Sequence, residues 1–271
     1  RSALIYALNN ITPLGKLSEP DSKSPLTLKI IKEMHKILLN NVRGSTKHPG
    51  QFKTGQNYIG SYERISYTPV PPELTNDYMG NLEAYIHMNE PNILIQAAII
   101  HAQFEMIHPF EDGNGRIGRL LIPLFLYYSG KIFTPTFYMS SFFEHDRSLY
   151  LQKLANISQN NDWFDWIEYF LNGVIIQAKS NIQKVQNILS LYDSYKAKSD
   201  RIRSIYYVQV LDFIFQHPIF TVSMLNKEIN TSRQTLYNLI NKMQENNIPL
   251  DVPSFNKKEK TFICRELLDL I

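Results

Sequence analysis

The stretch HPFEDGNGRIGR at residues 108–119 joins two segments that are apolar with helical spacing, residues 91–107 and 116–128. Gly113 and Gly115 flank Asn114, and glycine permits the positive φ angles that turn several backbone N–H groups toward one point. The helix expected to follow directs the positive end of its dipole at the same point. The stretch therefore predicts a turn between two buried helices that binds an anion, with phosphate the expected anion.

Four of the charged or titratable side chains in this stretch could act together on a phosphate substrate. Arg116 and Arg119 are three residues apart, so both guanidinium groups can reach one anion. Asp112 is a hard oxygen ligand of the kind that Mg²⁺ prefers beside phosphate oxygens. His108 has an unperturbed pKa near neutrality and can accept a proton from a hydroxyl nucleophile. We expect Phe110 to face inward and anchor the loop.

A purely structural interpretation is the alternative. A glycine turn before a helix is most often structural, and so is a single histidine at the end of an apolar helix. Buried charges without partners are costly, however, and a base, a metal ligand and two arginines fall within this one short stretch. The combination favours a functional site.

The rest of the chain predicts a mostly α-helical protein. Helical spacing of apolar residues covers 26–41, 73–88, 91–107, 116–128, 144–157 and 162–195. Residues 44–72 are rich in glycine and proline and alternate like strands, which predicts a β-hairpin. The longest apolar run, 120–128, is about half the ~20 residues that a membrane span needs. We therefore expect no membrane partner.

The last seventy residues predict a separate unit. The polar segment 196–203 is the expected boundary, and helices over 207–216, 221–229 and 230–246 precede a hairpin at 249–264. This is the order of a winged helix-turn-helix. Arg233, Gln234 and Asn238 could contact DNA bases, and Lys257, Lys258 and Lys260 could meet phosphates. After residue 200 the chain has nine Lys and Arg residues and seven Asp and Glu residues, so this unit is only weakly basic. Dimerisation or docking of a target protein is therefore the alternative to DNA binding.

Composition narrows the class of protein further. The 271 residues carry 28 Lys and Arg against 25 Asp and Glu, a net charge of +3 that does not make nucleic-acid binding the default. The single cysteine, Cys264, can form no internal disulfide, which favours a reducing, cytoplasmic setting. The first residue is Arg1 rather than Met, and we expect further residues upstream.

Residues 108–119 resemble the signature of the Fic-domain family, HxFx(D/E)GNGRxxR, at every specified position. The resemblance extends over residues 26–195, and residues 201–271 are similar to the winged-helix module of one bacterial subgroup. It implies a helical Fic core with a hairpin flap, and three parts: an N-terminal segment (1–25), a catalytic domain (26–200) and a winged helix-turn-helix (201–271).

Family members typically transfer AMP from Mg²⁺-ATP to a Tyr, Thr or Ser hydroxyl of a target protein, or of themselves. By resemblance, His108 is the general base, Arg116 binds the β and γ phosphates and Arg119 buttresses the motif. Asp112 would hold the Mg²⁺. The nucleotide-binding residues implied are Phe110, Asp112, Gly113, Asn114, Gly115, Arg116, Arg119, Asp146 and Tyr150. The flap residues that would grip the target are Gln51, Phe52, Ile59 and Gly60.

Two departures from the family pattern and several alternatives remain. No inhibitory helix of the form (S/T)xxxE(G/N) is found, and Asp146 stands where relatives often have asparagine. Tyr150 could equally be a core residue, and His35 and His101 are interpreted as structural. The alternative functions are a DNA-binding regulator whose Fic core senses nucleotide, transfer of another nucleotide, and removal of AMP. A second copy of the chain, in a homodimer, is a further expected partner.

Overall fold

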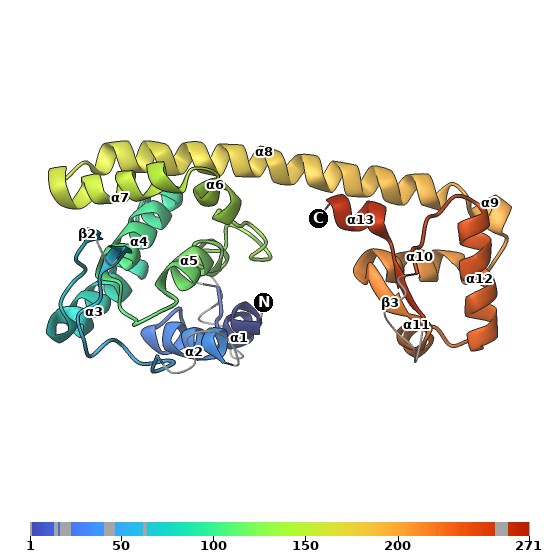
Figure 1. Ribbon diagram of the computed structural model, residues 1–271, viewed down its shortest axis with the longest axis horizontal. Coiled ribbons are helices and arrows are strands. Elements are labelled where there is room, and N and C mark those ends of the chain that lie inside the picture. The colour runs from blue at the N-terminus through green and yellow to red at the C-terminus, as the bar shows by residue number, and fades with distance from the viewer. Residues whose placement is uncertain are drawn as a thin grey trace. The chain divides into compact units, whose positions relative to one another are not determined.

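The computed structural model describes residues 2–13, 16, 23–40, 47–61, 64–252 and 260–270. The chain divides into two compact units, Arg1–Ala178 (unit 1) and Lys179–Ile271 (unit 2). Both are mostly helical, as the sequence predicts (Figure 1). No helix in the described part of the chain is long and apolar enough to cross a membrane.

Unit 1 contains the expected helices and the hairpin. Its elements are α1 (Ser2–Asn10), α2 (Leu28–Leu39), β1 (Ile59–Ser61), β2 (Arg64–Tyr67), η2 (Pro72–Leu74), α3 (Thr75–Ile86), α4 (Ile93–Ile107), α5 (Asn114–Tyr128), α6 (Ser140–His145), α7 (Arg147–Asn160) and the first half of α8 (Trp163–Lys196). The predicted helix over 144–157 is wrong at its start, because Asp146 interrupts it. The Asp146 carboxylate accepts the Leu149 N–H at 2.9 Å and caps α7.

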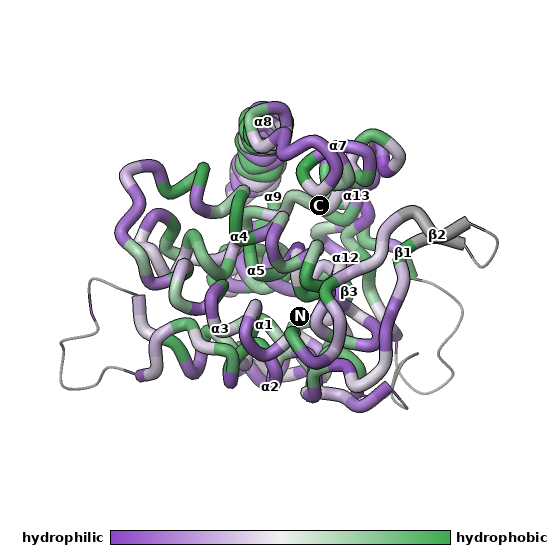
Figure 2. Tube along the Cα trace, turned by 90° about the vertical axis from the view of Figure 1, so that its left-hand side faces the viewer, coloured by the Kyte–Doolittle hydropathy of each residue, from purple (hydrophilic) through white to green (hydrophobic). Residues whose placement is uncertain are grey.

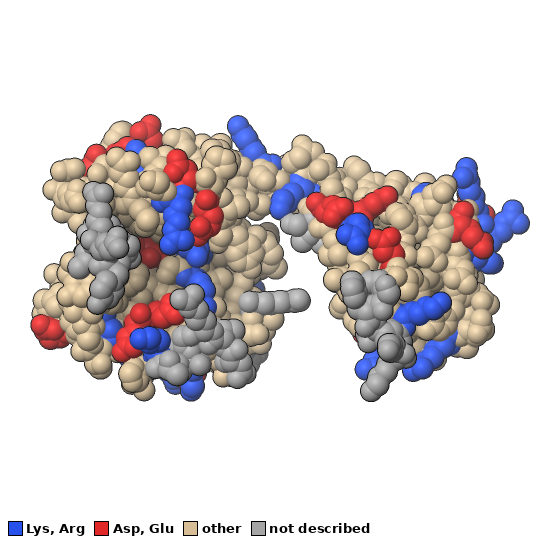
Figure 3. Space-filling view, viewed as in Figure 1, with Lys and Arg blue, Asp and Glu red and all other residues tan. Residues whose placement is uncertain are grey.

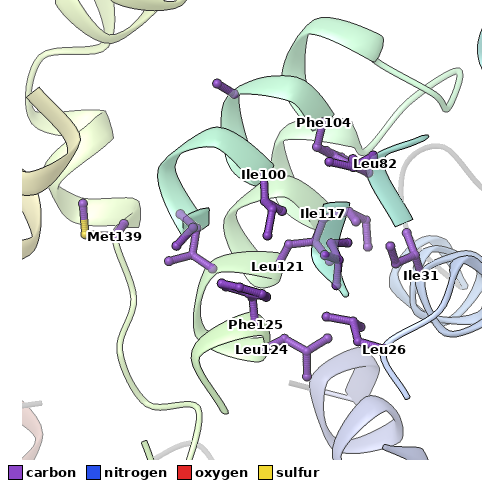
Figure 4. Close-up of a cluster of buried hydrophobic side chains, with 14 of the residues drawn as sticks. Leu26, Ile31, Leu82, Ile100, Phe104, Ile117, Leu121, Leu124, Phe125 and Met139 are labelled. Atoms are coloured by element: carbon purple, nitrogen blue, oxygen red, sulfur yellow. The ribbon is translucent and has the colours of Figure 1, made fainter. Parts of the chain in front are cut away.

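Helices α4 and α5 form the centre of unit 1. Asn92 caps the start of α4 by accepting the N–H groups of Leu94 and Ile95. Both helices carry many hydrophobic positions (Figure 2), and α5 buries most of residues 117–128. Figure 4 shows Ile100 and Phe104 of α4 beside Ile117 and Leu121 of α5 in the core. The packing of this helix pair fixes the ends of the loop at 108–113.

The hairpin is shorter than the sequence predicts. β1 and β2 pair antiparallel, with Gly60 opposite Ile65 and Ser61 opposite Arg64. Both strands lie within residues 59–67, whereas the described residues 47–58 form turns and extended segments without strands. Two of the four predicted flap residues, Ile59 and Gly60, are therefore in β1, and Gln51 and Phe52 precede it.

Unit 2 contains the three predicted helices, but its sheet differs from the predicted hairpin. Its elements are the second half of α8, α9 (Ser199–Ile202), α10 (Tyr207–Gln216), β3 (Ile219–Thr221), α11 (Val222–Glu228), α12 (Arg233–Glu245), β4 (Thr261–Ile263) and α13 (Arg265–Leu270). β4 pairs with β3, which the sequence did not predict. In the described part of the expected partner segment, Asp251 forms an isolated antiparallel bridge with Ile263 of β4. The wing positions Lys257 and Lys258 lie outside the described residues.

The division between the units falls inside α8, some twenty residues before the expected boundary at 200. Ile188, Leu191 and Tyr192 of α8 pack against the core of unit 2, which explains why the second half of the helix belongs there.

Candidate functional site

His108 ends α4 in the left-handed conformation, with φ +51°. Its Nδ1 lies 3.2 Å from the carbonyl of Glu105. Because a carbonyl can only accept, Nδ1 carries the proton and Nε2 keeps its lone pair. Burial lowers the pKa of His108 to about 4, and the nearby charge of Lys53 adds to this effect. The imidazole is therefore neutral near pH 7 and able to accept a proton.

Asn114 closes the loop on itself. Its side-chain oxygen accepts the Phe110 N–H at 2.8 Å, and its amide nitrogen donates to the Phe110 carbonyl at 2.7 Å. Gly113 has φ +83°, and its N–H donates to the Asp112 carboxylate at 2.6 Å. The resemblance implies that Asn114 and Gly113 bind nucleotide. In the structure the buried Asn114 side chain bonds within the loop, and the Gly113 N–H donates to Asp112.

His35 of α2 contacts the loop through a hydrogen bond and a ring stack. The Gly50 N–H donates to Nδ1 of His35 at 2.8 Å, so the proton lies on Nε2, which donates to the Asp112 carbonyl at 2.8 Å. The His35 ring stacks on Phe110, with centroids 3.8 Å apart. Both side chains are fully buried, so Phe110 anchors the loop as expected. The structural interpretation of His35 agrees with these contacts.

Residues 53–57, which we call the clamp segment, also form hydrogen bonds with this loop and with the end of α4. The Lys53 N–H donates to the Pro109 carbonyl at 2.8 Å, and its buried ammonium donates to the Ile107 carbonyl at 3.1 Å. Asn57 donates to the carbonyls of His108 and Phe110, at 3.0 and 2.9 Å. Burial lowers the pKa of Lys53 to about 8. Sequence reasoning missed Lys53 and Asn57, because their partners lie more than fifty residues away.

The two arginines of the motif have different partners. Arg116 lies 3.6 Å from Asp112, and both side chains are substantially exposed. Arg119 lies 3.6 Å from Glu144 of α6, which also pairs with Arg147 at 3.8 Å. Basic and acidic side chains gather around a hollow on this face of unit 1 (Figure 3). Glu144 and Arg147 were not predicted as site residues.

A cavity of about 510 Å³ opens beside the loop. His108, Gly115 and Arg119 line it together with Tyr150. Its other lining residues are Ile59, Tyr67, Glu105, Met106, Glu144, Arg147, Ser148, Leu151, Gln152, Leu154 and Ala155. Many of these are apolar, and the cavity can hold a small molecule with an apolar part and a charged part.

Tyr150 borders this cavity but is nearly buried. Its hydroxyl lies 3.0 Å from Nε2 of His101, whose Nδ1 lies 3.0 Å from the Gly118 carbonyl. His101 therefore donates through Nδ1 and accepts the Tyr150 proton, and burial lowers the His101 pKa to about 4. These two hydrogen bonds connect α4 with α5 and α7. They agree with the alternative interpretation of Tyr150 as a core residue.

Some of the other predicted residues line the cavity and others do not. Ile59 lines it. The Phe52 ring packs on Phe110, with ring centroids 5.5 Å apart, and Gln51 is exposed. Asp146 does not line the cavity; its carboxylate caps α7. Arg233, Gln234 and Asn238 lie exposed on α12 of unit 2.

The loop carries two carboxylates. Glu111 lies 3.0 Å from Nδ1 of His48, which leaves Asp112 as the carboxylate for a divalent metal. Asp112 is 43% exposed in its side chain, and Oδ1 is engaged by Gly113 and Arg116. Across the described residues, no group of three His, Cys, Asp or Glu side chains could hold a metal ion. This donor set fits Mg²⁺ that arrives with phosphate oxygens, because Mg²⁺ usually needs only one or two carboxylates.

Comparisons with known proteins agree on one family. Residues 25–126 match the model of the Fic/DOC family. A stretch of 104 residues is 35% identical to protein adenylyltransferase fic-1 of Caenorhabditis elegans, and covers 37% of this chain and 19% of that protein. A stretch of 108 residues is 32% identical to protein adenylyltransferase Fic of Aedes aegypti, with 39% and 20% covered. The match thus spans about a fifth of these relatives' length.

Two solved structures share the fold. A Fic family protein from Desulfovibrio desulfuricans superposes with a TM-score of 0.52 at 19% identity, over 88% of this chain and 68% of that chain. A Fic domain containing signaling protein from Bacteroides thetaiotaomicron gives a TM-score of 0.51 at 22% identity, over 67% and 68%. These likenesses concern the fold alone.

Proposed function

Because residues 25–126 match the model of the Fic/DOC family, we propose that the chain is a protein adenylyltransferase. It transfers AMP from ATP to a Tyr, Thr or Ser hydroxyl of a target protein or of itself. The observation that carries the proposal is the neutral His108 imidazole at the mouth of the cavity that Gly115 and Arg119 also line. The relatives named protein adenylyltransferase support the same reaction.

His108 acts as the general base in this proposal. Its Nε2 accepts the hydroxyl proton while the hydroxyl oxygen attacks the α-phosphorus of ATP. A new P–O bond forms, the bond to the β-phosphate oxygen breaks, and pyrophosphate leaves. The Glu105 carbonyl on Nδ1 keeps Nε2 free for the proton. Held in this way, His108 needs no rearrangement to reach a nearby hydroxyl.

The loop and α5 supply the positive charge that the phosphates require. Arg116, Arg119 and the N-terminal end of the α5 dipole all favour anionic groups. Asp112 would hold Mg²⁺ together with phosphate oxygens, and that ion would supply charge neutralisation of the phosphates. Arg116 must then exchange its ion pair with Asp112 for phosphate oxygens.

The hairpin is the proposed contact for the target protein. β1 and β2 form a two-stranded sheet, and an extended target segment can add to such a sheet by backbone hydrogen bonds. Ile59 of β1 also lines the cavity, which would bring a target residue close to His108.

The test uses ATP with a radioactive α-phosphate and Mg²⁺, with the purified protein and a cell lysate. We expect label on protein, its loss in His108→Ala, and no effect of His145→Ala, an exposed histidine at the end of α6. ATP labelled at the γ-phosphate should leave protein unlabelled. Persistent label in His108→Ala overturns the assigned base, and no transfer from any nucleoside triphosphate overturns the reaction.

A second candidate function rests on unit 2. Ser232 caps α12 by accepting the Thr235 N–H, and Arg233, Gln234 and Asn238 follow on its exposed face. Residues 229–244 contain no acidic side chain. Such a helix can enter the major groove of DNA. Gel shifts with a duplex DNA pool should show binding that Arg233→Ala abolishes and His108→Ala leaves intact, with Lys29→Ala of α2 as control. No shift at low salt excludes this candidate.

A further inference from the structure

The Glu105 carboxyl is buried without a hydrogen-bond partner for one of its oxygens. Glu105 lies on α4, three residues before His108, and is 7% exposed. Its Oε1 is the one buried side-chain polar atom of the described residues that has no partner. A buried acceptor left unpaired is costly, and most such atoms in native proteins are paired. Among the described residues, Oε1 therefore still lacks a donor.

Gly118 of α5 makes room for this carboxyl, and Gly115 lies within contact distance of it. A Cβ atom at Gly118 would lie 2.2 Å from Oε1 and 3.1 Å from Cδ of Glu105. A Cβ atom at Gly115 would lie 3.9 Å from Oε1 and 3.3 Å from a terminal nitrogen of Arg119. The carboxyl thus lies against the bare backbone of the first turns of α5, beside the proposed phosphate site.

The cavity that holds His108 and Arg119 is also lined by Glu105. Two donors that line the same cavity are engaged elsewhere. The Tyr150 hydroxyl is bonded to His101, and Arg119 pairs with Glu144. Apolar residues cover the same cavity, among them Met106, Leu151 and Leu154. The site therefore joins an apolar surface to an acceptor that awaits a donor.

We propose that Glu105 determines nucleotide specificity, with Oε1 accepting a hydrogen bond from an N–H or O–H group of the nucleoside part of the substrate. This inference rests on the proposed function. The triphosphate is excluded as the donor to Oε1, because near neutral pH its oxygens are negatively charged and act as acceptors. The ribose hydroxyls and the exocyclic amine of adenine are the donors that ATP offers.

Nucleoside monophosphates test this pairing without turnover, since they lack the pyrophosphate leaving group. Calorimetry would compare AMP with 2′-deoxy-AMP, 3′-deoxy-AMP and purine riboside monophosphate, which lacks the amine. The wild type should bind one of these analogues about 10- to 100-fold more weakly than AMP, because one hydrogen bond is lost and the buried acceptor is left unpaired. The analogue that loses affinity identifies the donor.

The variants decide whether Glu105 is the acceptor. Glu105→Ala should bind AMP and that analogue equally well, because removal of either partner breaks the same bond. Glu105→Gln keeps an acceptor oxygen and should retain part of the preference. Glu168→Ala, which removes an exposed carboxylate of α8 that does not line the cavity, should retain all of it. Circular dichroism of each variant checks that it folds.

Two contrary results have separate meanings. If Glu105→Ala preserves the wild-type preference among all the analogues while ATP still labels protein, this inference fails and the proposed function stands. If the wild type binds neither AMP nor ATP, the proposed function fails, and the role of Glu105 fails with it.

Discussion

At the scale of single residues, the Glu105 carboxyl should make stability depend on pH. Burial raises its pKa to about 7, against 4.5 in its ordinary state. Between these values the native state holds a proton that the unfolded chain has released, so this group's contribution to stability falls as pH rises. Glu105→Gln cannot titrate. The free energy of unfolding of the variant, relative to wild type, should rise by up to about 3 kcal/mol from pH 4.5 to 7, then stay constant.

Urea unfolding followed by tryptophan fluorescence across this pH range measures the difference. Comparison with the wild type cancels the contributions of His101 and His108, whose lowered pKa values act with the opposite sign. Glu144→Gln is the matched control, because that carboxylate is 47% exposed in its side chain and water screens it. A difference between wild type and Glu105→Gln that is constant with pH would contradict the burial argument.

The residues of the loop itself could be predicted from sequence, whereas their supports could not. Residues 108–119 are contiguous, so the positions of His108, Gly113 and Arg116 around one turn follow from their spacing. His35 and Lys53 reach the loop from α2 and the clamp segment, and only tertiary packing brings them there. Glu105 offered a weak local signal: it is an acid in an otherwise nearly uncharged helix, directly before the motif.

At the scale of elements, the clamp segment should set the rate of transfer rather than the affinity for ATP. Asn57 donates to two carbonyls of the loop, at His108 and Phe110. Asn57→Ala leaves both carbonyls without this donor and lets the loop shift, which should cost about 1–3 kcal/mol of stability. Because a small misplacement of a base slows chemistry strongly, we expect kcat to fall about 10-fold or more, with KM for ATP changed less.

Gln56→Ala is the control for this prediction, since the Gln56 amide donates to the carbonyls of Asn57 and Pro69 and not to the loop. Steady-state transfer at several ATP concentrations separates kcat from KM. If KM rises while kcat is unchanged, the clamp segment acts on nucleotide binding, and its assigned role in positioning His108 is wrong.

Elements with strong periodicity were predictable, and those defined by pairing were not. Helices α4, α5 and α10 carry their apolar pattern and their end signals in sequence, so their bounds are close to those expected. β3 is three residues long and is defined by its partner β4, more than forty residues further along the chain. A strand this short leaves no local signal that separates it from a turn.

At the scale of the whole molecule, each unit has its own hydrophobic core. Within the described residues the two core clusters have no buried member in common; Leu121 belongs to that of unit 1 and Leu211 to that of unit 2. The sequence predicts a boundary at the polar segment 196–203, whereas the two compact units meet after residue 178, inside α8. Composition marks where a chain is exposed, whereas packing decides which core a helix joins.

The two cores should respond separately to mutation, and the tryptophans make this measurable. Trp163 and Trp166 are the only tryptophans of the chain and both lie in unit 1, where the Trp166 indole donates to the Ala98 carbonyl at 3.0 Å. Leu211→Ala should cost unit 2 about 2–5 kcal/mol, because it opens a cavity in a closed core. It should lower the midpoint of part of the urea transition seen by circular dichroism and leave the fluorescence midpoint unchanged. Leu121→Ala should lower the fluorescence midpoint. A fluorescence midpoint that falls in Leu211→Ala would show that the units unfold as one cooperative body.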